Sequence, residues 1–221
     1  MPISAKDLLN QSSKDTYIYF MPESQRQQAL KDRLITDEDI KRVGPALTDA
    51  EKTALKSRMS LPERIFLYSV LSMAKIDMDL DKVQKDLSEL QNDINDLNKI
   101  MAQVTELNAK DKPEDRKMIM WDPRFKPFLK TLKRLQDKYG KEIDIEIFTS
   151  TKKGGGLNPT DGIPANIATE KLNNISKLLD NKVKTITTEF QKLNNLRNTI
   201  LETGSFSVKK VVDTARGMFS M

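Results

Sequence analysis

The residues that could carry out chemistry in this chain of 221 residues are limited by two absences, because it contains no cysteine and no histidine. A disulfide, a thiolate nucleophile, a Cys/His zinc site and a histidine general base are therefore excluded. Carboxylates, lysines and hydroxyls remain available for catalysis. They form no recognisable catalytic, cofactor-binding or metal-binding motif, so we expect a protein that is not an enzyme and that binds no cofactor.

Two patterns resemble ligand sites but favour a simpler interpretation. Asp77, Asp79 and Asp81 have the alternating spacing of a calcium loop, but its glycine and its terminal glutamate are missing. They also fall inside a helical repeat, where their carboxylates would point in different directions, so we interpret them as a solvated helix face. The glycines at 154–156 lack the spacing and the following lysine of a phosphate-binding loop, and we interpret them as part of a connecting loop.

The excess of positive charge lies in residues 110–153. This segment contains 13 basic and 8 acidic residues, a difference equal to the net charge of +5 of the whole chain. Aromatic residues are interleaved with lysines here, as on a surface that stacks on nucleic-acid bases, but a small helix with its rings packed inward would give the same pattern. We favour a surface that docks a partner protein over one that binds nucleic acid. Its candidate residues are Trp121, Phe125, Lys126, Lys130, Lys133 and Arg134.

A long helix is the clearest signal in the sequence. Ser60 and Pro62 have the residue types of a helix start, and neither proline nor glycine follows until Pro113. Apolar residues then recur at alternating spacings of three and four, which is the heptad pattern of a coiled coil. This helix is expected over 62–108, and its segment 65–73, which is apolar on more sides, should be buried more deeply than a simple two-helix seam requires. The seam residues of this helix are Ile76, Leu80, Val83, Leu87, Leu90, Ile94 and Leu97.

A second long helix is expected over 165–203, where the heptad spacing returns. Gly204 should end it, and 208–218 should form a short basic amphipathic helix that packs on the long helices rather than on a membrane surface. Each long helix alone would expose an apolar stripe to water, so we expect the two to pair as an antiparallel hairpin. The seam residues of the second helix are Leu172, Ile175, Leu179, Ile186, Phe190, Leu193, Leu196 and Ile200.

Local signals predict the smaller elements. Thr36 and Thr48 each begin a capping motif, which predicts two of several short helices near the N-terminus. A short amphipathic helix should begin at Phe128 and end at Gly140. The isoleucines within 143–147 alternate with acidic residues, which predicts a strand.

These elements predict a mainly α protein, built on a long antiparallel helical hairpin that is an intramolecular coiled coil, with a small α+β insertion and short N-terminal helices. The expected domains are the N-terminal helices and loops at 1–60, the hairpin at 61–109 plus 165–221, and the basic insertion at 110–164. The sequence has no apolar run long enough to span a membrane and no apolar segment typical of a cleavable signal peptide. We therefore expect a protein that is secreted without such a signal or, alternatively, is cytoplasmic in a membrane-associated complex.

The order of these elements resembles a known family. A helical, broken N-terminal region comes first, and an apolar-headed long helix over 62–108 follows. A middle module that ends in the Ile-Asp-Ile-Glu of 143–146 and a long Asn/Thr-rich helix over 172–189 come after it. This layout resembles the hydrophilic translocators of type III secretion systems, meaning the needle-tip proteins and their filament-forming relatives. The resemblance covers residues 60–221. It implies an intramolecular coiled coil whose C-terminal helix mediates assembly with the needle or with neighbouring subunits.

The function expected on these grounds is structural. The chain is predicted to be an assembly subunit of a bacterial secretion system, with other protein subunits, identical or different, as its partners. A cytosolic helical adaptor that docks proteins of a larger secretion complex is the alternative. Nucleic-acid binding through the basic insertion is the third possibility.

Overall fold

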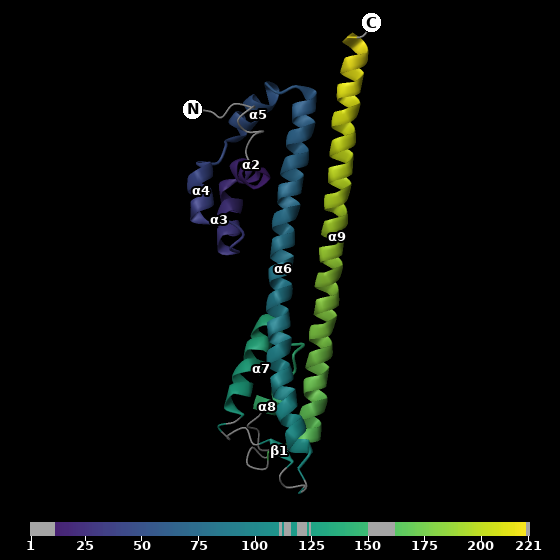
Figure 1. Cartoon of the computed structure of the whole chain (residues 1–221). Coiled ribbons are helices and arrows are strands. Elements are labelled where there is room, and N and C mark those ends of the chain that lie inside the picture. Colours follow the sequence, from purple (N-terminus) through teal and green to yellow (C-terminus); the bar gives the residue numbers. More distant parts are fainter. Residues whose placement is uncertain are drawn as a thin grey trace. The chain divides into compact units, whose positions relative to one another are not determined.

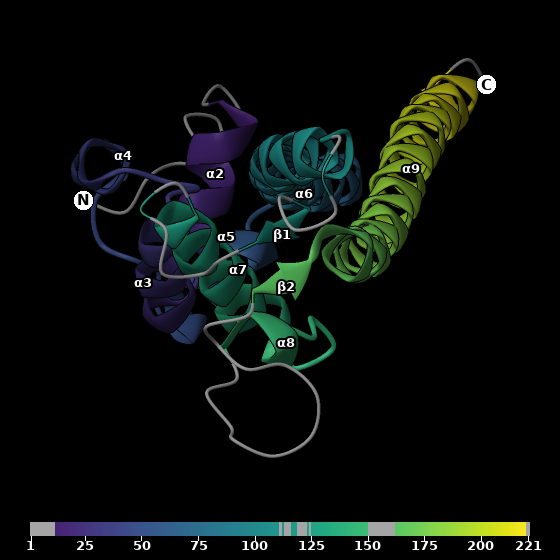
Figure 2. The ribbon, with the colours of Figure 1, turned by 90° about the horizontal axis from the view of Figure 1, so that it is seen from below.

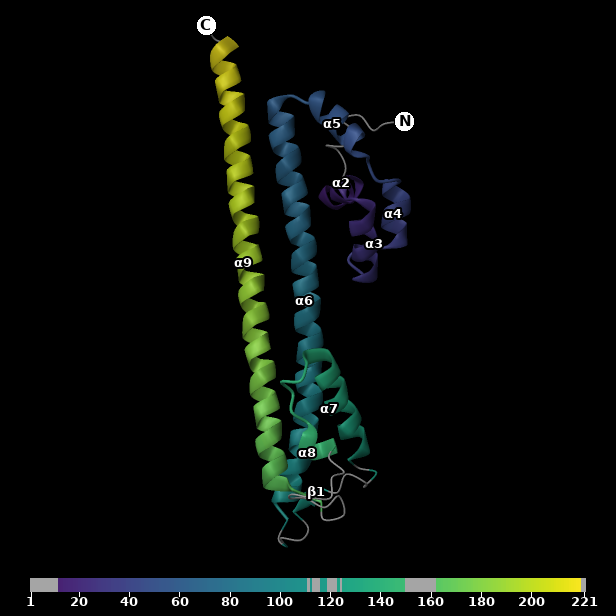
Figure 3. The same cartoon turned by 180° about the vertical axis from the view of Figure 1, so that it is seen from behind.

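The computed structural model describes residues 12–110, 112, 116–118, 123, 125–149 and 162–219, and within 208–219 it describes the side chains of 209, 210 and 213 only. Trp121 and the glycine run at 154–156 lie outside these residues, and so does Ser4, where another capping pattern in the sequence predicts a helix start. Two long helices dominate the chain, α6 (Leu61–Asn108) and α9 (Ala165–Phe219), as Figures 1 and 3 show. The fold is mainly α, and the predicted antiparallel hairpin is confirmed.

The chain divides into two compact units, and both long helices contribute to each. Unit 1 comprises Met1–Lys85 and Thr188–Met221, and unit 2 comprises Asp86–Thr187. These boundaries differ from those expected from sequence, which assigned the hairpin to one domain of its own. The N-terminal helices instead share a unit with the first half of α6, and the insertion shares a unit with the second half.

Unit 1 contains four short helices besides its parts of α6 and α9. They are α2 (Ser13–Phe20), α3 (Glu23–Lys31), α4 (Asp37–Val43) and α5 (Asp49–Ser57). The predicted caps are confirmed, because Thr36 and Thr48 both form complete capping boxes. Sequence reasoning missed α2, although Ser12 caps it by accepting a hydrogen bond from the amide of Asp15. Two small apolar clusters hold this unit together, one around Leu67 of α6 and one around Met78.

Unit 2 packs the insertion against α6 and α9 around one large apolar core. Its further elements are β1 (Lys117–Met118), α7 (Lys126–Tyr139), α8 (Glu146–Thr149) and β2 (Ile163–Pro164). The strands pair antiparallel, with Met118 opposite Ile163, close to the start of α9 (Figure 2). The core joins residues of α6, α7 and α9, including Leu97, Leu132 and Leu172, all fully buried. The predicted end of α7 at Gly140 is confirmed.

The prediction of a strand within 143–147 is wrong. Ile143 and Ile145 are buried as the alternation required, but they lie in a turn that leads into α8. The carboxylate of Asp144 accepts a hydrogen bond from the amide of Glu146 (3.1 Å), and the side chain of Gln136 donates to the carbonyl of Ile143 (2.8 Å). These local bonds occupy backbone groups that a strand ladder would need.

The predicted helix end at Gly204 is also wrong, because α9 continues to Phe219. A Cβ added to Gly204 would lie 2.7 Å from the hydroxyl oxygen of Ser69 and 3.1 Å from its Cβ. Glycine is therefore used here for a close approach of α9 to α6 rather than to end a helix. Residues 208–218 are the last turns of α9 and not a separate helix, and the packing predicted for them concerns side chains outside those described.

The deep burial expected at the head of α6 is found for some of its residues only. Leu67 is fully buried, but Phe66 and Tyr68 on either side of it are exposed to 44% and 52%. Ile65, Val70, Leu71 and Met73 of the same segment are partly buried, and Ser69 closely approaches Gly204 of α9. The segment is therefore covered on more than one side, while Phe66 and Tyr68 remain exposed.

Candidate protein-docking surfaces

The predicted seam residues do not form a uniformly dry interface. In unit 2 most of them are buried, and only Leu87 and Ile186 are partly buried. The buried ones are Leu90, Ile94, Leu97, Leu172, Ile175 and Leu179. In unit 1, Ile76 and Val83 are buried, Leu80, Phe190, Leu193 and Ile200 are partly buried, and Leu196 is 49% exposed. The packing between the long helices is therefore tight in unit 2 and looser in unit 1.

Small polar residues explain the looser packing in unit 1. A hollow of about 340 Å³ lies between α6 and α9. It is lined mostly by serine, threonine and glycine, at Ser69, Ser72, Thr199, Thr203, Gly204 and Ser207, together with Ile65, Tyr68 and Ile200. Short side chains bring little apolar surface across the seam, so several large apolar side chains in this segment are not covered by the facing helix.

Six large apolar residues are exposed on the two long helices within unit 1, and one of them, Leu61, is the first residue of α6. We call the other five the hairpin-end residues and consider them candidates for docking a partner; they are Phe66, Tyr68, Leu196, Leu201 and Phe206. Phe206 is the most exposed, at 67%, and Lys56 lies over the ring of Tyr68 at 5.0 Å from its centroid. Several large exposed apolar side chains in one unit are candidates for contact with a partner.

Sequence reasoning missed Asp93, which is almost completely buried on α6. Its carboxylate pairs with Lys138 (2.8 Å) and Arg134 (3.0 Å) and accepts a hydrogen bond from the hydroxyl of Tyr139 (2.6 Å). Burial and the bond to Asp93 raise the pKa of Tyr139 to about 12. An acidic residue directly beside the seam residue Ile94 was the available signal, and its role is to fix α7 on α6.

The residues predicted to dock a partner through the insertion divide into three groups. Phe125 is buried and packs edge-on against Phe128, with ring centroids 5.4 Å apart. Arg134 forms ion pairs with Asp93 and Asp96 of α6 (3.0 Å each). The exposed, unpaired cations of the predicted set, among the residues that the structure describes, are Lys126, Lys130 and Lys133.

The aromatic residues of α7 therefore face inward. This is the alternative considered from the sequence, a small helix with its rings packed inward, rather than a base-stacking surface. Phe128 is buried and Tyr139 is tied to Asp93, so the described part of the insertion presents no exposed aromatic ring. Trp121 lies outside the described residues. A surface that binds single-stranded nucleic acid usually offers such rings to the bases.

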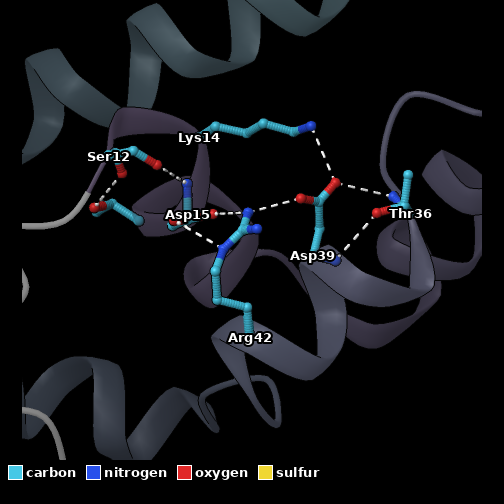
Figure 4. Close-up of polar contacts among 7 residues, drawn as sticks. Ser12, Lys14, Asp15, Thr36, Asp39 and Arg42 are labelled. Carbon is cyan, nitrogen blue, oxygen red and sulfur yellow. Dashed lines mark hydrogen bonds and ion pairs between the residues drawn. The ribbon is translucent and has the colours of Figure 1, made fainter.

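A polar network joins α2 to α4 in unit 1, as Figure 4 shows. The buried carboxylate of Asp39 accepts bonds from the Lys14 ammonium (3.0 Å), the Thr36 amide (3.0 Å) and Arg42 (2.7 Å). Arg42 also pairs with Asp15 (2.7 Å). Burial alone would raise the pKa of Asp39, but these hydrogen bonds outweigh it and hold the pKa at about 2. The charges in this network satisfy one another, so it positions helices rather than offering a ligand site.

Comparison of the chain with protein-family models, with curated proteins and with solved structures finds no match. Within the part of the chain that the structure describes, no helix is long and apolar enough to cross a membrane. Among the same residues, no three acidic side chains gather as a metal site would require. The surfaces described above are therefore the basis for a functional proposal.

Proposed function

We propose that this protein is a non-enzymatic structural subunit that assembles with other protein subunits through the hairpin-end residues. The observation that carries the proposal is the exposure of five large apolar side chains on the two long helices of unit 1. Complete burial of one such side chain contributes about 1.5–3 kcal/mol, so covering the exposed halves of five would contribute roughly 4–7 kcal/mol. That gain can offset much of the entropy lost on association.

The proposed biological setting is a bacterial secretion system. The resemblance to needle-tip and translocation-filament proteins supports it, and so does the position of three hairpin-end residues on α9, the C-terminal helix. Such a subunit would be secreted without a cleavable signal. The alternative proposal is a cytosolic adaptor of a larger secretion complex, which would use the same residues to dock its partners.

Sedimentation velocity over a range of protein concentrations tests assembly. We expect the unchanged chain to associate as its concentration rises, and the double variant Leu196→Asp with Phe206→Asp to remain monomeric. The matched control is Asn195→Asp with Ser205→Asp, which changes two exposed polar residues of the same helix and should associate normally. If all three proteins sediment alike, the hairpin-end residues do not mediate assembly.

Fractionation of the producing cell separates the two settings. Accumulation in the culture supernatant, without removal of an N-terminal segment, is expected for a tip or filament subunit. Retention with the cytosolic or membrane-associated fraction would instead support the adaptor.

A further inference from the structure

Helix α7 has three distinct faces. Its inward face carries Phe128, Leu132 and Leu135, which are buried in the core of unit 2. One flank carries Arg134 and Lys138, and carboxylates of α6 neutralise both. Those partners are Asp93, Glu89 and Asp96, at 2.8–3.1 Å.

The third face points to solvent and carries uncompensated positive charge. We call Lys126, Lys130 and Lys133 the lysine face, and all three are exposed and form no ion pair with any described residue. Their spacings of four and three place them in one row along the helix. The neighbouring cations on α7 are neutralised by α6, and this row is not.

Two hollows border the lysine face, and Lys130 and Lys133 line both. One hollow, of about 600 Å³, has the apolar residues Pro123, Pro127 and Leu129 between its lysines. The other, of about 790 Å³, is more polar, with Thr131 and Asp137 among its lining residues. The first hollow therefore combines an apolar floor with a cationic rim.

We propose that the lysine face and the apolar hollow beside it bind an acidic amphipathic helix of a partner protein. Carboxylates at spacings of four and three on such a helix would meet the row of lysines, and apolar side chains next to them would cover Leu129 and the two prolines. The charge complementarity would speed and orient docking, and the apolar contact would add affinity. An acidic helix fits both halves of this surface, whereas a small anion would use only the lysines.

Nucleic acid fits the surface less well. The rings of Phe125 and Phe128, beside the lysine face, are buried, so bases could not stack on them. Residues 86–187 contain 18 basic and 16 acidic residues, so unit 2 as a whole offers little long-range attraction to a polyanion.

This inference is independent of the proposed assembly through the hairpin-end residues. The two surfaces share no residue and belong to different units. Sedimentation tests assembly through the hairpin-end residues, and peptide binding tests the lysine face. A negative result in one experiment therefore does not affect the other proposal.

Fluorescence anisotropy of a labelled synthetic peptide with the full-length chain provides the test. The probe is an amphipathic helical peptide with three glutamates at spacings of four and three and leucines beside them, and a matched peptide carries glutamine in place of each glutamate. We expect the glutamate peptide to bind at low salt, and the glutamine peptide to bind about tenfold more weakly or not at all. Binding of both peptides with equal affinity, or of neither, would overturn the proposal.

Charge-reversal variants locate the site. Lys126→Glu with Lys130→Glu and Lys133→Glu should weaken binding of the glutamate peptide by about tenfold or more. The matched control is Lys110→Glu with Lys112→Glu and Lys177→Glu, which changes the net charge equally at exposed lysines away from α7 and should bind the peptide with little loss. Circular dichroism checks that all variants remain helical. Equal weakening by the two triple variants would show general charge attraction and refute a specific site.

Competing ligands are tested on the same proteins. Single-stranded and duplex oligonucleotides, and vesicles of phosphatidylcholine with phosphatidylserine, should not displace the peptide at equal charge concentration. Displacement by an oligonucleotide would assign the surface to nucleic acid, and displacement by vesicles would assign it to a membrane. Loss of self-association in the lysine-face variant would assign it to a second copy of the chain, and each of these results overturns the proposal.

Discussion

At the scale of single residues, buried charges position the elements of both units. Asp39 joins α2 to α4, and Asp93 joins α6 to α7. Arg26 uses backbone groups instead, because its guanidinium donates to the carbonyls of Ile18 (2.9 Å) and Gly44 (2.6 Å). These carbonyls lie at the C-terminal ends of α2 and α4, where a cation interacts favourably with the helix dipole. Removing any of these charges would break the contacts that it makes to a neighbouring element.

Asp39 should make the stability of unit 1 sensitive to acid. Its pKa is about 2 in the folded chain and near 3.8 when unfolded, so the unfolded state binds the proton more readily. The stabilising contribution of the carboxylate is present above pH 3.8 and is lost as the pH falls towards 2. The difference corresponds to about 2 kcal/mol at neutral pH.

Urea denaturation at a series of pH values measures this contribution. Asp39→Asn should be less stable than the unchanged chain at neutral pH, and the two free energies of unfolding should converge as the pH approaches 2. Asp37→Asn, at an exposed position in the same helical turn, is the control and should change stability little. A constant difference between Asp39→Asn and the unchanged chain at all pH values would contradict the assigned pKa.

At the scale of elements, caps and heptads predicted most helices, and contacts between helices decided the exceptions. The local signals at Thr36, Thr48 and Gly140 correspond to real helix ends. Gly204 has the residue type of a helix end but lies inside α9, because Ser69 approaches it closely. No local pattern distinguishes a glycine that ends a helix from one that admits a neighbouring helix.

Substitution of Gly204 should therefore disturb the pairing of α6 with α9. Gly204→Val places side-chain atoms where Ser69 already lies, and we expect a loss of about 1–3 kcal/mol in the free energy of unfolding. Ser205→Val is the control, because Ser205 is the exposed next residue of the same helix and its substitution should be close to neutral. Thermal unfolding followed by circular dichroism compares them. Equal melting temperatures for the two variants would mean that α9 does not need glycine at this position.

At the scale of the whole molecule, the two units differ in how much apolar surface they bury. Unit 2 has one continuous core that joins α6, α7, α8 and α9, whereas unit 1 relies on two small clusters and a loosely packed seam. Burial of apolar surface is the main source of stability, so the long helices should not be equally stable along their length. Their less stable halves also carry the hairpin-end residues, which suits a segment that packs fully only in an assembly.

Native-state hydrogen exchange should reveal this gradient along both long helices. We expect amides near Leu97 and Leu172 to exchange at least about tenfold more slowly than those near Leu71 and Ile200, because the former belong to the large core. Mass spectrometry of peptides from the exchanged full-length chain resolves the two regions. Uniform protection from one end of each helix to the other would show that the halves unfold as a single unit.

The sequence by itself determined the elements whose causes are local. The heptad periodicity over many residues predicted α6 and α9. The free-energy cost of exposing an apolar stripe on each helix to water predicted that the two would pair as a hairpin. The same information predicted that Lys126, Lys130 and Lys133 would form a charged surface, which agrees with their exposure. These inferences hold because a helix and its polar face depend on residues within a few turns of each other.

Only the tertiary structure decided which residues meet across the chain. It places Gly204 against Ser69 and Asp93 against Lys138, and it pairs strands at 117–118 and 163–164 instead of 143–147. It also left Phe66 exposed, although the surrounding sequence is among the most apolar in the chain. Burial, close approach and charge pairing depend on partners that lie tens of residues away, and a single-chain pattern does not specify those partners.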